Sequence, residues 1–171
     1  MDNMEMARII LAKGTSFLEK EQAFAYLKKK KIFNESANIS AAQKYLPVWI
    51  GLVTAYANRE PFRPKKHIYP VYIDALNGEC FLLKKTPVLT PIKVFRQAII
   101  KPLVTKKQAK DKIEDLKKVQ IRNLYILRKP KLFELDLKLI FRPVLLVKNE
   151  DRFFWLNQLT SKIEDMPNMP N

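Results

Sequence analysis

The chain has 171 residues, enough for one ordinary domain or two small ones, and 47% of them are hydrophobic, which excludes disorder by composition. Its formal net charge is +15, so nucleic acid, anionic lipid and acidic proteins are the partners that it would attract. The only cysteine is Cys80 and the only histidine is His67, which excludes an internal disulfide and argues against a Cys/His zinc site or a nucleophile–histidine pair.

The N-terminal segment carries Asp2 and Glu5 ahead of only four apolar residues, 9–12, which is not the pattern of a signal peptide. The longest near-apolar run, 45–57, is too short to span a bilayer and is interrupted by a proline. The sequence therefore predicts a cytoplasmic protein without a transmembrane segment. A leader removed before Met1 is the alternative.

The first predicted helix covers 17–32. Ser16 and Glu19 have the spacing of a capping box, in which each side chain bonds the other residue's backbone N–H. The apolar positions expected to face the core are Phe17, Ala23, Phe24 and Leu27. The helix ends in four cations that interact favourably with a helix C-terminus, namely Lys28, Lys29, Lys30 and Lys31.

Three further capping or proline signals predict helices. Their starts are Ser40 with Gln43, Thr90 with Pro91, and Thr105 with Gln108. Pro47 and Pro102 end the first two of these helices, and the third runs from 106 to about 121. The buried positions expected in the third helix are Ala109, Ile113 and Leu116.

Strands are predicted where β-branched and aromatic residues are frequent or where apolar and polar residues alternate. These segments are 47–57, 67–74, 132–141 with its continuation 143–147, and 152–157. The alternation is clearest in 132–141, where the residues expected to point inward are Phe133, Leu135, Leu137, Leu139 and Phe141. Glu134, Asp136 and Lys138 are expected to point outward.

The strongest turn signal follows the strand 67–74. Asn77 and Gly78 adopt the positive φ of a tight hairpin at low cost, and Gly78 is predicted to have such a φ. Asp74 is expected to accept hydrogen bonds from backbone N–H groups across the turn. We interpret Asp74, Asn77 and Gly78 as structural turn residues, and a functional site at the turn is the alternative.

Short matches between distant segments indicate an internal duplication. The matched pairs are "KEQA" (20–23) with "KKQA" (106–109) and "VYIDALNGE" (71–79) with "FWLNQLTSK" (154–162). The second match aligns Asp74 with Asn157. A chance likeness between two segments of similar composition is the alternative.

These elements together predict an α+β fold, with helices packed on an antiparallel sheet in two similar helix-plus-hairpin halves. The halves would be 1–88 and 89–171, either as separate units or as parts of one continuous domain.

The stretch "YPVYIDALNGE" resembles the ending of PepSY-like domains, an aromatic-rich strand followed by Asp-Ala-x-x-Gly-Glu. The matching residues are Asp74, Ala75, Gly78 and Glu79. A helix on an antiparallel sheet is also similar to the cystatin-like families. The resemblance covers 70–79, and 142–164 only as a degenerate copy, in which Asn157, Ser161 and Lys162 replace the aspartate, the glycine and the glutamate. It implies a non-enzymatic module that binds a protein or peptide, often to regulate peptidases.

Cations are the candidate binding residues. Those expected to form a basic face are Lys28, Lys29, Lys30, Lys31, Arg59, Arg63, Lys65 and Lys66. Residues 93–148 add 16 Lys and Arg against 5 Asp and Glu. Such a face fits an acidic protein or peptide, and the alternative partner is nucleic acid, bound through its phosphates.

An enzyme is not expected. Glu114 and Asp115 fall on a helix surface, and Glu150 and Asp151 fall in a turn, so the acids form no catalytic pair. Three glycines are too few for a phosphate-binding loop, and no cofactor is predicted.

One strand is a candidate docking edge. Residues 48–54 carry no charge, so a partner segment could pair beside them if the strand lies at the edge of the sheet. The alternative is a central, buried strand.

Overall fold

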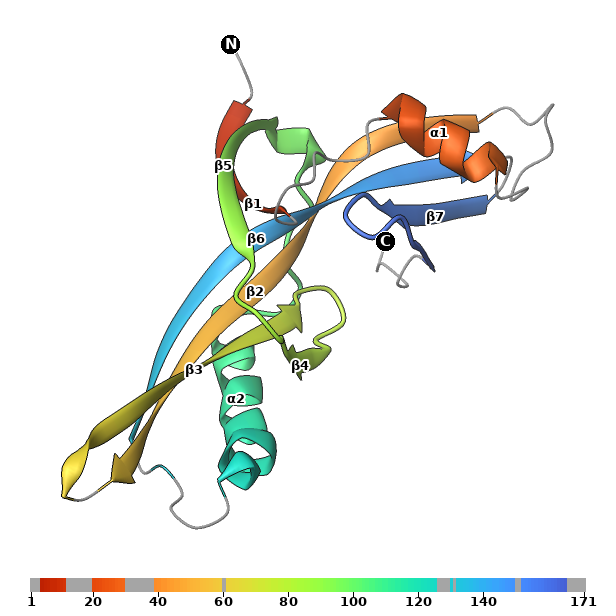
Figure 1. Ribbon diagram of the computed structural model, residues 1–171. Helices are drawn as coiled ribbons and strands as arrows, with labels where there is room; N and C mark the ends of the chain where they lie inside the picture. Colours follow the sequence, from red (N-terminus) through yellow and green to blue (C-terminus); the bar gives the residue numbers. More distant parts are fainter. Residues whose placement is uncertain are drawn as a thin grey trace. The chain divides into compact units, whose positions relative to one another are not determined.

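The computed structural model describes residues 4–11, 20–29, 39–59, 61–125, 130, 132–149 and 152–165. Within them the chain forms one eight-stranded sheet and two α-helices (Figure 1). The strands are β1 (Met4–Leu11), β2 (Ile39–Arg59), β3 (Phe62–Asp74), β4 (Cys80–Leu82), β5 (Val88–Phe95), β6 (Leu132–Asn149), β7 (Arg152–Asn157) and β8 (Ile163–Asp165). The helices are α1 (Lys20–Lys29) and α2 (Lys106–Leu116).

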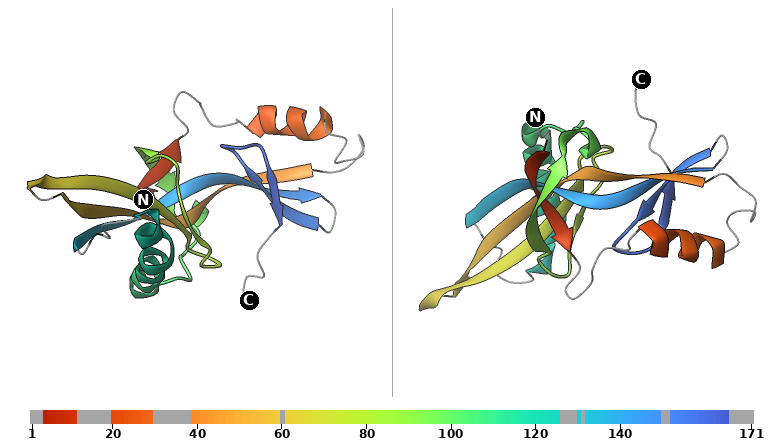
Figure 2. Two further views of the ribbon diagram at one scale, coloured as in Figure 1. Left: turned by 60° about the horizontal axis from the view of Figure 1, so that its bottom comes forward. Right: turned by 90° about the horizontal axis from the view of Figure 1, so that it is seen from above.

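The strand order is β4-β3-β2-β6-β1-β5, with β7 beside β6 and β8 beside β7. The pairs β2–β3, β3–β4, β1–β5, β6–β7 and β7–β8 are antiparallel, whereas β1 meets β6 in parallel, with Ile9 opposite Phe141. The sheet is therefore mixed. The longest strands, β2 with 21 residues and β6 with 18, are neighbours in it and can be followed in Figure 2.

The α+β fold with helices packed on an antiparallel sheet, expected from the sequence, is wrong. The protein is sheet-dominated, with 57% strand against 24% helix, and its two helices are short. Two segments predicted as helices are strands: Ser40 and Gln43 lie in β2, and Thr90 and Pro91 lie in β5.

Side-chain chemistry explains this error. A capping-box spacing involves only two residues, and tertiary pairing overrides such a local preference. In β5 the alternate residues Val88, Thr90, Ile92 and Val94 are all β-branched, and all eight residues of the strand pair with β1.

The other helix predictions had a different outcome. The pattern of Ser16 and Glu19 lies outside the described residues, and α1 occupies the inner part of the predicted segment 17–32. The third prediction is confirmed: Thr105 and Gln108 form a capping box at the start of α2. The buried residues of α2 are Ala109, Ile113 and Leu116, as expected.

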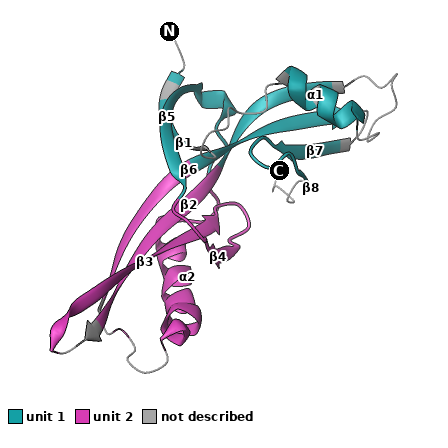
Figure 3. Ribbon diagram, in the orientation of Figure 1, with its two compact units in different colours: residues 1–46, 87–101, 141–171 teal, residues 47–86, 102–140 magenta. Residues whose placement is uncertain are grey.

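The chain divides into two compact units, coloured separately in Figure 3. Unit 1 comprises 1–46, 87–101 and 141–171, and unit 2 comprises 47–86 and 102–140. Each unit therefore takes segments from both sides of residue 88, rather than corresponding to one half of the sequence.

The core of unit 1 joins α1 to β6 and β7. Ala23 and Leu27 of α1 are buried against Leu145, Val147 and Leu156, which belong to the two strands. Alternate residues of each strand face this cluster, as the two-residue period of a strand requires.

The core of unit 2 joins α2 to β2, β3 and β6. Its buried residues are Trp49, Val53, Val71, Ile73, Ala75, Ala109, Ile113, Leu116, Ile121 and Leu137. Phe133, Leu135 and Leu139 pack against this cluster, whereas Glu134, Asp136 and Lys138 are exposed, so the predicted alternation is confirmed for 133–139. It ends there, because Ile140 is fully buried and Phe141 is half-buried.

In both units the helix packs in a core with strands from the other half of the sequence. In unit 1 the core joins α1 to β6 and β7, which follow residue 88. In unit 2 the core joins α2 to β2 and β3, which precede residue 88, and also to β6 from its own half. The expected helix-plus-hairpin halves are wrong, because each core combines segments from both halves and the protein is sheet-dominated.

Neither described helix has the length and the apolar character that crossing a bilayer requires.

Candidate binding site

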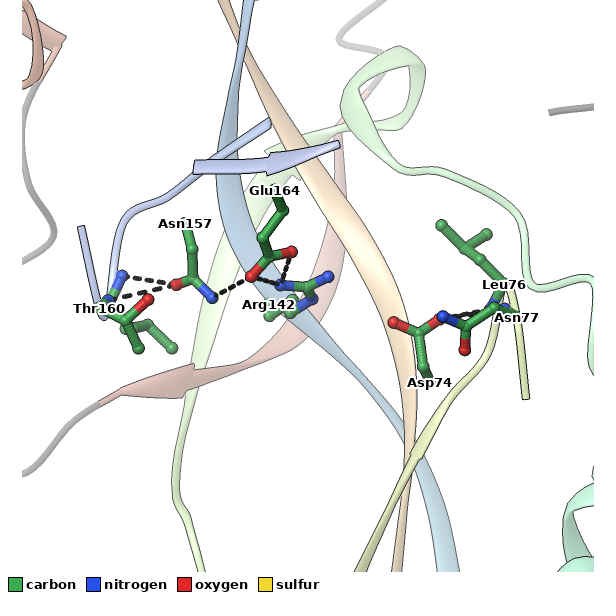
Figure 4. Close-up of polar contacts among 8 residues, drawn as sticks. Asp74, Leu76, Asn77, Arg142, Asn157, Thr160 and Glu164 are labelled. Carbon is green, nitrogen blue, oxygen red and sulfur yellow. Dashed lines mark hydrogen bonds and ion pairs between the residues drawn. The ribbon is translucent and has the colours of Figure 1, made fainter. Parts of the chain in front are cut away.

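The turn after β3 is closed by its own residues (Figure 4). Asp74 Oδ1 accepts hydrogen bonds from the backbone N–H of Leu76 (2.8 Å) and of Asn77 (3.3 Å). The Gly78 N–H donates to the carbonyl oxygen of Asp74 (2.9 Å), and Asn77 Oδ1 accepts from the Glu79 N–H (2.8 Å). Gly78 has a φ of 78°, so its predicted positive φ is confirmed. These contacts support the structural interpretation of the turn.

The turn after β7 repeats this geometry. Asn157 Oδ1 accepts from the N–H groups of Leu159 (3.0 Å) and Thr160 (3.3 Å), and the Ser161 N–H donates to the Asn157 carbonyl (2.8 Å). The bond from the Asn157 N–H to the Lys162 carbonyl measures 2.9 Å, as does the bond from Asp74 to Glu79. The predicted match of 71–79 with 154–162 is therefore confirmed in backbone geometry.

The second turn has an additional polar network. Asn157 Nδ2 donates to Glu164 Oε1 at 2.9 Å, and Arg142 Nη1 donates to both oxygens of Glu164 at 2.8 and 2.6 Å (Figure 4). The Arg142 side chain is only 12% exposed, so this ion pair is more shielded than an ordinary surface pair.

The first turn also positions α2. The Ala75 carbonyl accepts hydrogen bonds from the N–H groups of Leu103 (2.8 Å) and Val104 (2.9 Å), and Trp49 Nε1 donates to the Val104 carbonyl (2.8 Å). The capping residue Thr105 follows directly. These hydrogen bonds fix the position of the chain just before α2, which is a structural role for the turn.

The predicted cations are distributed over both units. Lys28 and Lys29 are exposed at the end of α1 in unit 1, and Arg63, Lys65 and Lys66 are exposed on β3 in unit 2. Lys30 and Lys31 lie outside the described residues, and the Arg59 side chain does as well. A single basic face made of all these residues stays a prediction.

Helix α2 carries further cations. Its exposed lysines are Lys106, Lys107, Lys110 and Lys112. The helix continues into a turn in which Lys117 and Lys118 pair with Glu114 and Asp115, three residues earlier in each case. The positive charge of α2 is therefore least compensated in its first two turns.

Unit 1 contains a groove that the sequence did not predict. It has a volume of about 550 Å³ and lies between the beginning of β2 and the end of β5. The lining residues are Met4, Ala42, Gln43, Lys44, Tyr45, Lys93, Val94, Phe95, Gln97 and Ala98. Two lysines and no carboxylate occur among them, so the groove combines apolar walls with positive charge.

Hydrogen bonds fix one wall of the groove. Lys44 Nζ donates to the Gln97 carbonyl (3.0 Å), and the Tyr45 carbonyl accepts from the Ile100 N–H (3.0 Å). Gln43 Nε2 donates to the Val144 carbonyl (3.1 Å). Burial raises the pKa of the Tyr45 phenol, so this group is neutral and can donate or accept a hydrogen bond.

The strand beside the groove is an edge strand. Within the described part of the sheet, β5 pairs with β1 on one side and has no strand on the other. By contrast, β2 lies between β3 and β6, so the docking edge predicted at 48–54 is wrong and the central, buried alternative is correct. Val48 and Val53 are fully buried.

Cys80 and His67, the single cysteine and the single histidine of the sequence, lie in different surroundings. Burial raises the pKa of the Cys80 thiol, although the nearby Lys112 acts in the opposite direction. His67 lies against the rings of Tyr69 and Tyr125, whose hydroxyls are 2.9 Å apart. No group of three or more His, Cys, Asp or Glu side chains in the described ranges is arranged to hold a metal ion.

Sequence reasoning missed the groove because it assigned 40–46 and 90–102 to helices. The parts of β2 and β5 that line the groove lie in those segments. The β-branched alternation of 88–94 was the signal that could have revealed β5.

The chain was also compared with known proteins. No protein-family model matches it, and neither the curated proteins nor the solved structures contain a significant match.

Proposed function

We propose that the protein is a non-enzymatic module that binds a segment of another protein, as the PepSY-like and cystatin-like resemblance implies. The groove in unit 1 carries this proposal, because it places apolar side chains and two lysines at the end of β5, a strand with one edge unpaired in the described sheet. Recognition of a peptide segment needs both elements: a strand edge supplies main-chain hydrogen bonds, and pockets select side chains.

The exposed hydrophobic residues around the groove support this function. Phe95 is 52% exposed, Met4 is 44% exposed and Met6 is 62% exposed. Met4 pairs with Phe95 across β1 and β5, and Met6 pairs with Lys93. Several exposed apolar side chains on neighbouring strands are more typical of an interaction surface than of a surface that contacts only water.

Nucleic acid is the second candidate partner. The observation that favours it is the run of exposed lysines in the first two turns of α2, together with the formal net charge of +15. A protein that neutralises several phosphates releases their counterions, so its affinity falls steeply as the salt concentration rises.

Binding measurements on the full chain would test the two candidates. A library of labelled peptides and a mixed-sequence nucleic acid would be titrated with the protein at a low and a high salt concentration. Peptide binding that decreases only moderately with salt supports the proposed function. Binding of nucleic acid alone, with a steep salt dependence, would replace it with the second candidate.

A further inference from the structure

We propose that the occupant of the groove is an acidic, extended segment of a partner protein that adds as a strand to the free edge of β5. The inference rests on the proposed function and goes beyond it, because it specifies the binding mode, the chemistry of the partner and the residues that select it.

The position of Pro91 indicates which part of the edge is used. Proline has no N–H, so within a sheet it is tolerated where its nitrogen faces away from the neighbouring strand. Pro91 lies opposite Arg8 of β1 in an otherwise continuous pairing, so its nitrogen is expected to face the outer edge. Strand residues two apart have the same orientation, which places the N–H groups of Lys93 and Phe95 on that edge too.

This arrangement limits strand addition to the end of β5. Pro91 interrupts the row of outer donors, and such an interruption also protects a strand against uncontrolled edge-to-edge pairing. Between Pro91 and the C-terminal end of β5, the outer donors are the N–H groups of Lys93 and Phe95. Both of these residues line the groove. A strand added there would therefore place its alternate side chains at the groove.

The groove accepts one apolar side chain of the added strand. Tyr45, Val94, Phe95 and Met4 supply its apolar wall, and the neutral Tyr45 phenol adds a polar group at that wall. A volume of about 550 Å³ exceeds what a single side chain needs, so a leucine or an aromatic residue fits without rearrangement of the backbone.

Charge selects an acidic segment. Lys93 is exposed beside the edge, and Lys44 uses one of its three N–H donors to hold the Gln97 carbonyl. Residues 87–101 contain three cations and no acid. A carboxylate on the added strand would meet positive charge and no competing carboxylate of the described groove.

The test uses synthetic peptides of about eight residues, the length of a typical strand, in which glutamate alternates with leucine or phenylalanine. Fluorescence anisotropy with the full chain should show binding of these peptides, and no binding of counterparts in which lysine replaces glutamate. The variant Lys93→Glu should weaken binding by about tenfold, because it replaces attraction with repulsion at the edge. The matched control, Lys84→Glu, makes the same charge change at an exposed lysine of unit 2 and should leave binding within about twofold of wild type.

Peptide backbones provide a second, independent readout with the unaltered protein. Methylation of every other peptide N–H should abolish binding in one register and preserve it in the other, because only alternate amides of an added strand face its neighbour. Equal binding of both methylated peptides would overturn strand addition, even if Lys93→Glu weakens binding.

The remaining outcomes separate the two proposals. Peptide binding that Lys93→Glu and Lys84→Glu weaken equally would overturn the proposed site while leaving the binding function in place. Concentration-dependent dimers that Lys93→Glu dissociates would show that a second copy of the chain occupies the edge, which also overturns the inference. Failure of every peptide in the library to bind would overturn both proposals.

Discussion

The turns that follow β3 and β7 have the same backbone hydrogen bonds and different side-chain chemistry. In the first turn Asp74 accepts two N–H bonds and Gly78 has the positive φ, whereas Asn157 and Ser161 occupy these positions in the second. Ser161, with a φ of 56°, is the non-glycine residue with positive φ among those described. The second turn thus lacks the aspartate and the glycine of the first, although its backbone hydrogen bonds are the same.

The neighbouring strand explains the exchange of aspartate for asparagine. Glu164 of β8 lies beside Trp155, and at the corresponding place in unit 2 Phe81 lies beside Tyr72 and stacks on it at 4.8 Å. An aspartate beside Glu164 would bring two carboxylates together. Asparagine avoids this repulsion, because its oxygen holds the turn while its NH₂ group donates to Glu164. Equivalent turns can thus differ because of what lies next to them.

The largest predicted effect is that of Asn157→Asp, which gives the second turn the aspartate of the first. Asn157→Asp removes the donor to Glu164 and adds a carboxylate beside it, so the free energy of unfolding should fall by about 3 kcal/mol near neutral pH. Urea unfolding would measure the loss. The loss should shrink in acid, because protonation of the introduced aspartate removes the repulsion. An unchanged midpoint at neutral pH would show that the Glu164 contact has no part in stability.

The next effect concerns the first turn alone. Gly78→Val should lower the free energy of unfolding by about 2 kcal/mol, because a β-branched residue is strained at positive φ. Its Cβ would also lie 2.9 Å from Lys112 Cε, a flexible side chain that can move aside. Gly78→Asn is the matched control, since asparagine tolerates positive φ and should destabilise the protein less. Equal thermal midpoints for both variants would contradict backbone strain as the cause.

A smaller effect of opposite sign is expected at the equivalent position of the second turn. Ser161→Gly should raise the free energy of unfolding by about 0.5–1 kcal/mol, because glycine adopts positive φ without steric strain. Thermal denaturation of this variant can be compared with that of Thr160→Gly, whose position is not at positive φ and which should not be stabilised. Destabilisation by Ser161→Gly would mean that the contacts of the serine side chain stabilise the protein by more than the positive φ of residue 161 destabilises it.

The smallest effect is predicted for the reverse exchange in the first turn. Asp74→Asn keeps the oxygen that accepts from Leu76 and Asn77, so the free energy of unfolding should fall by only about 0.5 kcal/mol, from weaker bonds to an uncharged acceptor. The same urea unfolding experiment allows this loss to be compared with that of Asn157→Asp. A loss as large as that of Asn157→Asp would break the proposed asymmetry between the turns.

The two cores add a second difference between local sequence and fold. The two helices place matching residues at the same offset, Ala23 with Ala109 and Leu27 with Ile113, and all four are buried. Yet the core of each helix includes strands from the other half of the sequence, and the core of α2 also includes β6 from its own half. The apolar face of each helix is therefore covered by strands that lie far from it in the sequence.

Local chemistry determined the features that depend on a few adjacent residues. The positive φ of Gly78, the capping box of Thr105 with Gln108, the alternation of 133–139 and the match of Asp74 with Asn157 could all be read from the sequence. Each of these depends on bonds and side-chain directions that are set within a turn, a helix end or a single strand.

Only the tertiary structure decided which segments became strands and what they met. Thr90 and Pro91 resembled a helix start, but pairing with β1 along all eight residues of β5 outweighed that local signal. The groove between β2 and β5, the central position of β2 and the packing of each helix with strands from the other half of the sequence depend on contacts between residues far apart in the chain. The sequence of a segment indicates its local preference for helix or strand. Which strand or helix it packs against is decided only when the sheet and both cores form together.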